Sequence, residues 1–85
     1  SYHDITVAEI VPGNVLLVRA GEIVPADGVM VSEMAVLDES AVTGEPIPVD
    51  KARGTALRSG TLNAGNTFEM RADATAGDST YAGIV

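Results

Sequence analysis

Thr67-Phe68-Glu69-Met70-Arg71-Ala72-Asp73-Ala74 is the stretch that decides the fold of this sequence. Its apolar residues Phe68, Met70 and Ala72 alternate with residues that are mostly polar. Alternation with a period of two is the pattern of a β-strand that buries one face and exposes the other to water. The stretch therefore predicts a long strand over residues 67–74 that packs by one face against a core.

The rest of the chain is divided by glycine and proline into short segments rich in β-branched residues, which is typical of an all-β sandwich or barrel. Four further strands are expected, over Val15–Arg19, Gly28–Glu33, Ala35–Asp38 and Thr55–Arg58. A fifth, short strand is expected near Ile5–Val7. Val15-Leu16-Leu17-Val18 is apolar at every position. That run predicts a central strand covered on both faces.

A minor helix is expected at the C-terminal end. Asp78 or Ser79 is a suitable N-cap, and Tyr81, Ile84 and Val85 follow at the spacing of one helical face. We therefore expect residues 1–85 to be a single domain fragment that ends at the start of a helix.

The composition limits what the domain can be. Hydrophobic residues make up 46% and aromatic residues only 4%, so the core must consist mainly of aliphatic side chains, with Met30, Met34 and Met70 as fillers. The chain has no cysteine, which excludes disulfides and thiolate metal sites. His3 has no second ligand in view, so no bound metal is expected. No apolar run approaches the roughly 20 residues that span a bilayer.

The charge is strongly acidic, with twelve acids against five bases and a net charge of −7. Such a polyanion repels nucleic acid, so no nucleic-acid partner is expected. Three of the bases, Lys51, Arg53 and Arg58, fall within eight residues. They form either a solvated basic edge or a contact surface for another domain.

One carboxylate stands at the tip of a turn in Thr43-Gly44-Glu45-Pro46, after a glycine and before a proline. This arrangement holds an acid away from the body of the domain. We expect Glu45 to act on a group that these 85 residues do not bind alone.

The longer stretch Leu37-Asp38-Glu39-Ser40-Ala41-Val42-Thr43-Gly44-Glu45-Pro46-Ile47-Pro48-Val49-Asp50-Lys51 resembles the signature loop of the actuator domain of P-type ATPases. These are ion pumps that pass through an aspartyl-phosphate intermediate. Other segments resemble the family in the family's order: Pro12-Gly13-Asn14-Val15, Gly21-Glu22-Ile23-Val24-Pro25-Ala26-Asp27-Gly28, Ser59-Gly60-Thr61-Leu62-Asn63-Ala64-Gly65 and Gly77-Asp78-Ser79-Thr80. The resemblance covers nearly the whole chain.

The resemblance implies a distorted jelly roll, a double-stranded β-helix of short strands, whose Thr-Gly-Glu loop swings onto the phosphorylation domain. There Glu45 would orient and activate the water that hydrolyses the aspartyl phosphate. Gly44 would let the backbone approach the phosphoryl group without a Cβ in the way. Thr43 would fix the loop through its hydroxyl.

Four neighbouring residues would shape this loop. Asp38, Glu39 and Ser40 would do so through bonds from side chain to backbone. Pro46 stands where the family usually has serine; because proline lacks a backbone donor and fixes φ, it implies a stiffer loop. The lead-in to the loop and the turn at Gly21–Gly28 look most like the heavy-metal-transporting class.

The same resemblance implies a cytoplasmic domain of an integral membrane protein. Its partners would be the phosphorylation domain, the nucleotide-binding domain and the transmembrane helices of the same polypeptide, and the fragment itself would be monomeric. Mg²⁺ and ATP are implied for the full-length pump, whereas the fragment would bind no cofactor. It contains no phosphate-accepting Asp-Lys-Thr-Gly segment, so alone it is expected to be inactive.

Two alternatives come from other classes of protein. Asp50-Lys51-Ala52 matches the tip of lipoyl domains, which would make the chain a lipoyl- or biotinyl-carrier domain modified at Lys51. A carrier lysine needs a tight hairpin, however, and Pro46 and Pro48 make this loop looser. The second alternative is a free-standing binding or adhesion module with a jelly-roll sandwich.

Overall fold

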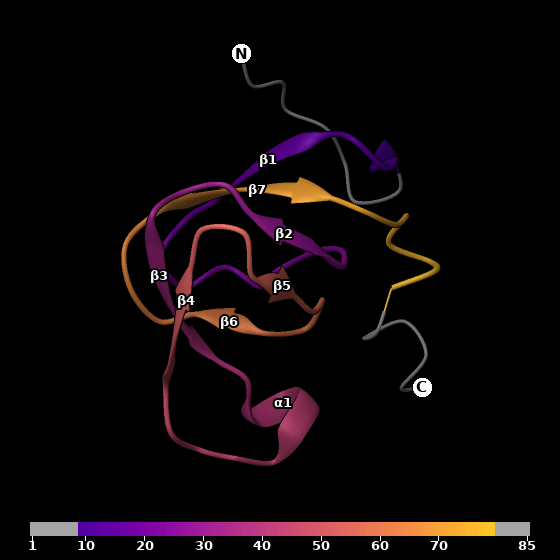
Figure 1. Ribbon diagram of the computed structural model, residues 1–85. Coiled ribbons are helices and arrows are strands. Elements are labelled where there is room, and N and C mark those ends of the chain that lie inside the picture. The colour runs from indigo at the N-terminus through magenta and orange to yellow at the C-terminus, as the bar shows by residue number, and fades with distance from the viewer. Residues whose placement is uncertain (1–8, 80–85) are drawn as a thin grey trace.

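Residues 9–79 are described by a computed structural model, in which they form two antiparallel sheets (Figure 1). The first has the spatial order β1-β7-β2-β5 and the second the order β4-β3-β6. The strands are β1 Val15–Val18, β2 Gly28–Met30, β3 Met34–Asp38, β4 Val49–Ala52, β5 Ala56–Leu57, β6 Leu62–Asn63 and β7 Phe68–Ala72. A four-residue helix, α1 Ser40–Thr43, follows β3. The predicted all-β fold of short strands is confirmed.

Strand β7 holds the first sheet together, because it pairs with β1 on one side and with β2 on the other. Its residues Phe68, Met70 and Ala72 are buried, whereas Arg71 between them is exposed. The alternation in the sequence therefore predicted both the strand and its buried face correctly. Strand β7 is two residues shorter at its C-terminal end than expected.

The core lies between the two sheets and is mainly aliphatic, with Phe68 as its one aromatic member among the described residues. Both sheets contribute to it, the first through Met30, Leu57 and Met70 and the second through Ala35 and Leu37. Met30 and Met70 are core fillers as predicted. The same prediction is wrong for Met34, whose side chain is 57% exposed at the beginning of β3.

Strand β1 is not the central strand that its apolar run predicted. Within residues 9–79 it lies at the edge of its sheet and pairs with β7 alone. It buries Leu16 and Val18, while Leu17 is half-buried and Val15 is 43% exposed. The central place belongs to β7, whose alternating pattern covers the core with every second residue.

Three elements were not predicted by the periodicity of the sequence, namely β4, β6 and α1. Strand β4 lies at the edge of its sheet. It shows no apolar alternation because a lysine, Lys51, occupies one of its two half-buried positions. Strand β6 and helix α1 are too short to leave a periodic pattern. The expected strand near Ile5–Val7 and the expected C-terminal helix with Tyr81 lie outside the described residues.

Candidate functional site

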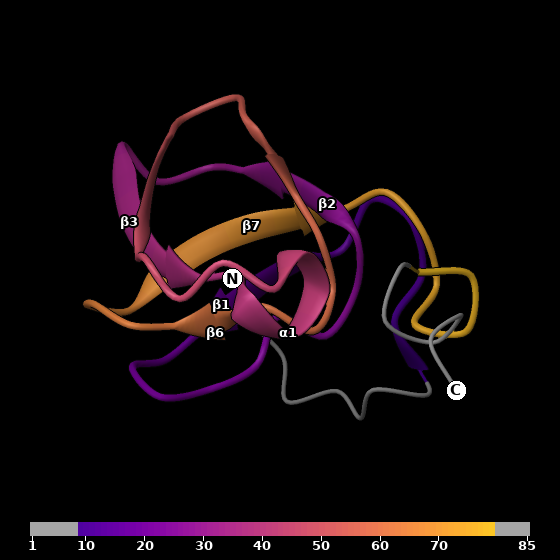
Figure 2. The same ribbon diagram turned by 90° about the horizontal axis from the view of Figure 1, so that it is seen from below.

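The predicted acidic turn lies at one end of the domain, where α1 projects away from β1 and β7 (Figures 1 and 2). The helix stops at Gly44, which adopts the left-handed conformation with φ 79° and ψ 0°. Its N–H donates to the carbonyl oxygen of Ser40 at 2.8 Å. A residue with a Cβ would be strained in this conformation, so glycine is what allows the chain to turn here. The turn places Glu45 outside the helix.

The hydroxyl of Thr43 connects the base of the helix to its tip. Its Oγ1 donates to the carbonyl oxygen of Glu39 at 3.1 Å and accepts the backbone N–H of Glu45 at 3.1 Å. The side chain of Glu45 is exposed, and within residues 9–79 its carboxylate has no hydrogen-bond or ion-pair partner. Pro46, which follows it, is also exposed. The backbone of Glu45 is thus fixed while its side chain is exposed to solvent.

Asp38 and Ser40 hold the beginning of the helix. The backbone N–H of Ser40 donates to Oδ1 of Asp38 at 2.9 Å. Hydrogen bonding from the Ser40 side chain, and then from its backbone, lowers the pKa of Asp38 below its usual value. The predicted role of Asp38 in shaping the loop through side-chain-to-backbone bonding agrees with this contact.

The lowered pKa of Asp38 predicts a pH dependence. An aspartate with a lowered folded-state pKa stabilises the fold fully above its unfolded pKa of about 3.9 and loses that contribution as the pH falls through the folded-state pKa. We expect Asp38→Asn to remove this acid-side loss, so that thermal unfolding midpoints of the variant fall less between about pH 5 and pH 2 than those of the wild type. Asp50→Asn, which removes an exposed acid of β4, is the matched control. Parallel pH profiles for wild type and Asp38→Asn would contradict the prediction.

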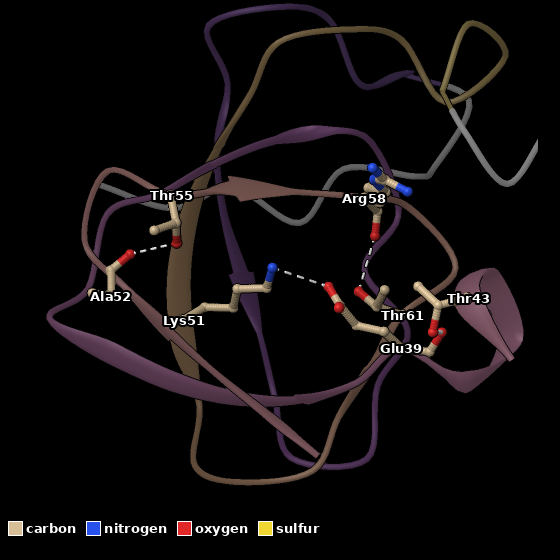
Figure 3. A network of polar contacts seen from close by, with 7 residues as sticks. All are labelled: Glu39, Thr43, Lys51, Ala52, Thr55, Arg58 and Thr61. Atoms are coloured by element: carbon tan, nitrogen blue, oxygen red, sulfur yellow. Dashed lines mark hydrogen bonds and ion pairs between the residues drawn. The ribbon is translucent and has the colours of Figure 1, made fainter. Parts of the chain in front are cut away.

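Glu39 and Lys51 form an ion pair, with 3.2 Å between Oε2 of Glu39 and Nζ of Lys51 (Figure 3). The side chains are 13% and 22% exposed respectively. In the strand register Lys51 lies opposite Ala35, a core residue, so it stands on the inward face of β4. Lys51 therefore lies inside a strand, which does not match the hairpin tip of a carrier lysine.

The other two cations of the predicted basic edge are placed differently. Arg53 lies at the far end of the β3–β4 pair, where its Nε donates to the carbonyl oxygen of Val31 at 2.9 Å. Arg58 is exposed beyond β5, and its carbonyl oxygen accepts the hydroxyl of Thr61 at 2.9 Å. The structure thus brings Lys51 to the loop but does not bring Arg53 to it. The contact of these three residues with another domain stays a prediction.

The structure places Asp38, Glu39, Ser40, Thr43, Gly44 and Glu45 along one continuous segment, from the end of β3 through α1 to the residue after its cap, and adds Lys51 from a separate strand. Sequence reasoning named all seven but missed the pairing of Lys51 with Glu39, because β4 was not predicted. The signal available in the sequence was a pair of opposite charges, Glu39 and Lys51, one on each side of the Thr43–Pro46 turn. Among the residues of the described range, no three His, Asp or Glu side chains are grouped so as to hold a metal ion.

Comparison with known proteins agrees with this geometry. The family model of the P-type ATPase actuator domain matches residues 1–85. Copper-transporting ATPase 1 of Rhizobium meliloti (strain 1021) is 39% identical over 82 residues, which are 96% of this chain and 10% of that protein. The silver exporting P-type ATPase of Salmonella typhimurium is 37% identical over 82 residues, again 96% and 10%.

The fold is shared with a solved pump. A crystal structure of a zinc-transporting PIB-type ATPase in the E2.Pi state superposes with a TM-score of 0.91 at 34% sequence identity, covering 96% of this chain and 14% of that chain. The chain spans about a tenth of the length of the curated relatives it matches. The match over its whole length and the shared fold show that this chain belongs to the family of P-type ATPase actuator domains.

Proposed function

We propose that this chain is the actuator domain of a heavy-metal-transporting P-type ATPase and that Glu45 promotes hydrolysis of the aspartyl phosphate on the phosphorylation domain. The relatives named above are copper, silver and zinc transporters, which supports the heavy-metal class. Neither the lipoyl- or biotinyl-carrier alternative nor the adhesion module gains support from the matches.

The observation that carries the proposal is the arrangement at Thr43-Gly44-Glu45. The backbone of Glu45 is held by the Thr43 hydroxyl, and its carboxylate is free of partners among residues 9–79. A carboxylate on a fixed backbone suits a group that must position a water molecule against a phosphoryl group supplied by another domain. Pro46 contributes loop shape to this site and no chemistry.

The rest of the pump completes the function. The phosphorylation domain, the nucleotide-binding domain and the transmembrane helices would belong to the same polypeptide, with the actuator on the cytoplasmic side. Mg²⁺ and ATP would be bound by those other domains, and the heavy-metal ion is the substrate of transport. No helix formed by residues 9–79 has the length and apolar character needed to cross a membrane.

Replacement of Glu45 by glutamine tests the hydrolytic role. In the full-length pump, Glu45→Gln is expected to leave phosphoenzyme formation from ATP intact and to slow phosphoenzyme decay at least about tenfold, because general-base assistance is typically worth about 10²–10⁴ in rate. The measurement is the loss of radiolabelled phosphate after a chase with unlabelled ATP.

Glu33→Gln is the matched control, since Glu33 is an exposed acid just before β3, at the end of that strand away from the loop. Its phosphoenzyme should decay like that of the wild type. If the Glu45→Gln phosphoenzyme decays at the wild-type rate, the proposed role of Glu45 is wrong.

A further inference from the structure

Helix α1 has little of its own to hold it in place. None of its four residues is buried, and only Ser40 and Val42 are half-buried, so packing holds it weakly. Glu39, at its N-cap, makes no side-chain capping bond. A single turn of helix is unstable in isolation, because nucleation costs more conformational entropy than one or two hydrogen bonds return. Its position must therefore depend on contacts made from outside the helix.

The carbonyl oxygen of Glu39 accepts most of the hydrogen bonds that hold α1 together. It accepts the backbone N–H of Val42 at 2.9 Å, the backbone N–H of Thr43 at 2.8 Å and the hydroxyl of Thr43 at 3.1 Å. The same hydroxyl holds the N–H of Glu45. The Thr43 hydroxyl therefore links the backbone of Glu39 to the backbone of Glu45.

Beside the bond from Ser40 to Asp38, Lys51 supplies a second contact from outside the helix, and this one acts on Glu39. Its ammonium lies 3.2 Å from the Glu39 carboxylate, and both side chains are largely withdrawn from water. Figure 3 shows the Lys51 side chain directed at the Glu39 carboxylate, with Thr43 beyond it. Lys51 itself is part of β4, which is hydrogen-bonded to β3 along four residue pairs. The ion pair thus ties the base of the loop to the sheet.

We propose that Lys51 is a positioning residue for Glu45, acting within the domain through Glu39 and Thr43. The proposal rests on the hydrolytic role proposed for Glu45. It assigns the Lys51 ammonium to the loop of its own domain rather than to a contact with the phosphorylation domain. A misplacement of a reacting group by about 1 Å costs on the order of 10²-fold in rate, so a small shift of the loop base is enough to matter.

The test uses the full-length pump. Lys51→Met keeps the length of the side chain and removes its charge; it is expected to slow phosphoenzyme decay about tenfold and to leave phosphoenzyme formation from ATP within about twofold. Glu39→Gln removes the opposite charge at constant shape and is expected to slow decay in the same sense. Arg71→Met is the control, because Arg71 is an exposed cation of β7 in the other sheet, and its phosphoenzyme should decay at the wild-type rate.

The double variant Lys51→Met/Glu45→Gln shows whether Lys51 acts through Glu45 or directly on the phosphorylation domain. If Lys51 acts through Glu45, adding Lys51→Met to Glu45→Gln slows decay no further. Additional slowing in the double variant would overturn the inference, because Lys51 would then act on the phosphorylation domain directly. Slow decay in Glu45→Gln with normal decay in Lys51→Met would also overturn it, while the proposed function would stand. Loss of phosphoenzyme formation in both Lys51→Met and Glu39→Gln would show that the ion pair only stabilises the fold. That outcome would also overturn the inference that Lys51 positions Glu45.

Discussion

Replacing Gly28 with alanine is expected to lower the free energy of unfolding by about 3 kcal/mol or more. Gly28 is buried in β2, between Leu57 of β5 and Ala72 of β7. A Cβ at this position would collide with the carbonyl oxygen of Arg71 and would lie 2.8 Å from Cε of Met70. The methionine tip can move, but the carbonyl belongs to the backbone of the central strand. Relief would require β2 to separate from β7.

The measurement is the thermal unfolding midpoint of the 85-residue chain, which should fall by at least about 12 °C. Gly77→Ala is the control, because the nearest atom to a Cβ there is Oγ1 of Thr75 at 4.0 Å. Its effect should stay within about 0.5 kcal/mol. Similar midpoints for the two variants would show that β2 and β7 are not packed as closely as described.

The close packing around Gly28 shows what a resemblance leaves unexplained. The Gly21–Gly28 segment was matched to its family by residue type, and Asp27-Gly28 looks like an ordinary turn in the sequence. Gly28 is not in the left-handed region, so turn conformation does not require glycine there. The requirement comes from β7, more than 40 residues further along the chain. No local pattern can show a contact of this kind.

The parts of the fold that could be predicted are those whose cause is local. The alternation along β7 follows from its one buried face. The sequence therefore predicted both the strand and which of its residues are buried. The position of β1 at the edge of its sheet depends on which strands pair, and an apolar run does not contain that information. Strand β4 was missed because an edge strand with one half-buried lysine satisfies its environment through an ion pair and not through apolar alternation.

The candidate site divides in the same way. Gly44 followed by Pro46 is a helix-end signal in the sequence, and it would have located the end of α1 had it been used. The Asp38–Ser40 contact spans two residues and was expected from residue type. The Glu39–Lys51 pair depends on β4 lying beside β3, so it required the tertiary structure.

Replacing Asn63 with alanine is expected to cost about 3 kcal/mol, for a reason equally hidden from the sequence. Asn63 is 1% exposed in β6. Its Nδ2 donates to the carbonyl oxygens of Val18 at 3.1 Å and Asn66 at 2.9 Å, and its Oδ1 accepts the N–H of Gly65 at 2.9 Å. The bond to Val18 joins the second sheet to β1 of the first. Alanine would remove all three bonds, of which the one to Val18 is buried and the other two are part-buried. A lost hydrogen bond costs about 1 kcal/mol, and a buried group left unpaired about 1–3 kcal/mol.

Thermal unfolding of the 85-residue chain checks this prediction, with Asn66→Ala as the control. Asn66 is an exposed asparagine only three residues away, so its truncation should change the free energy of unfolding by no more than about 0.5 kcal/mol. Equal effects of the two substitutions would show that the Asn63 amide contributes no more than a solvated side chain.

Asn63→Asp gives the sharper test, because its effect must depend on pH. The new carboxylate would be buried against the carbonyl oxygens of Val18 and Asn66, where burial and the adjacent oxygens disfavour the charged form. Its folded-state pKa would therefore rise above the unfolded value of about 3.9, and the loss of stability would grow as the pH rises through the folded-state pKa. We expect the deficit relative to wild type to be larger at about pH 7 than at about pH 4, and to exceed that of Asn63→Ala at the higher pH. A deficit that is the same at both pH values would mean that the side chain reaches water, and that the link between the two sheets is made without it.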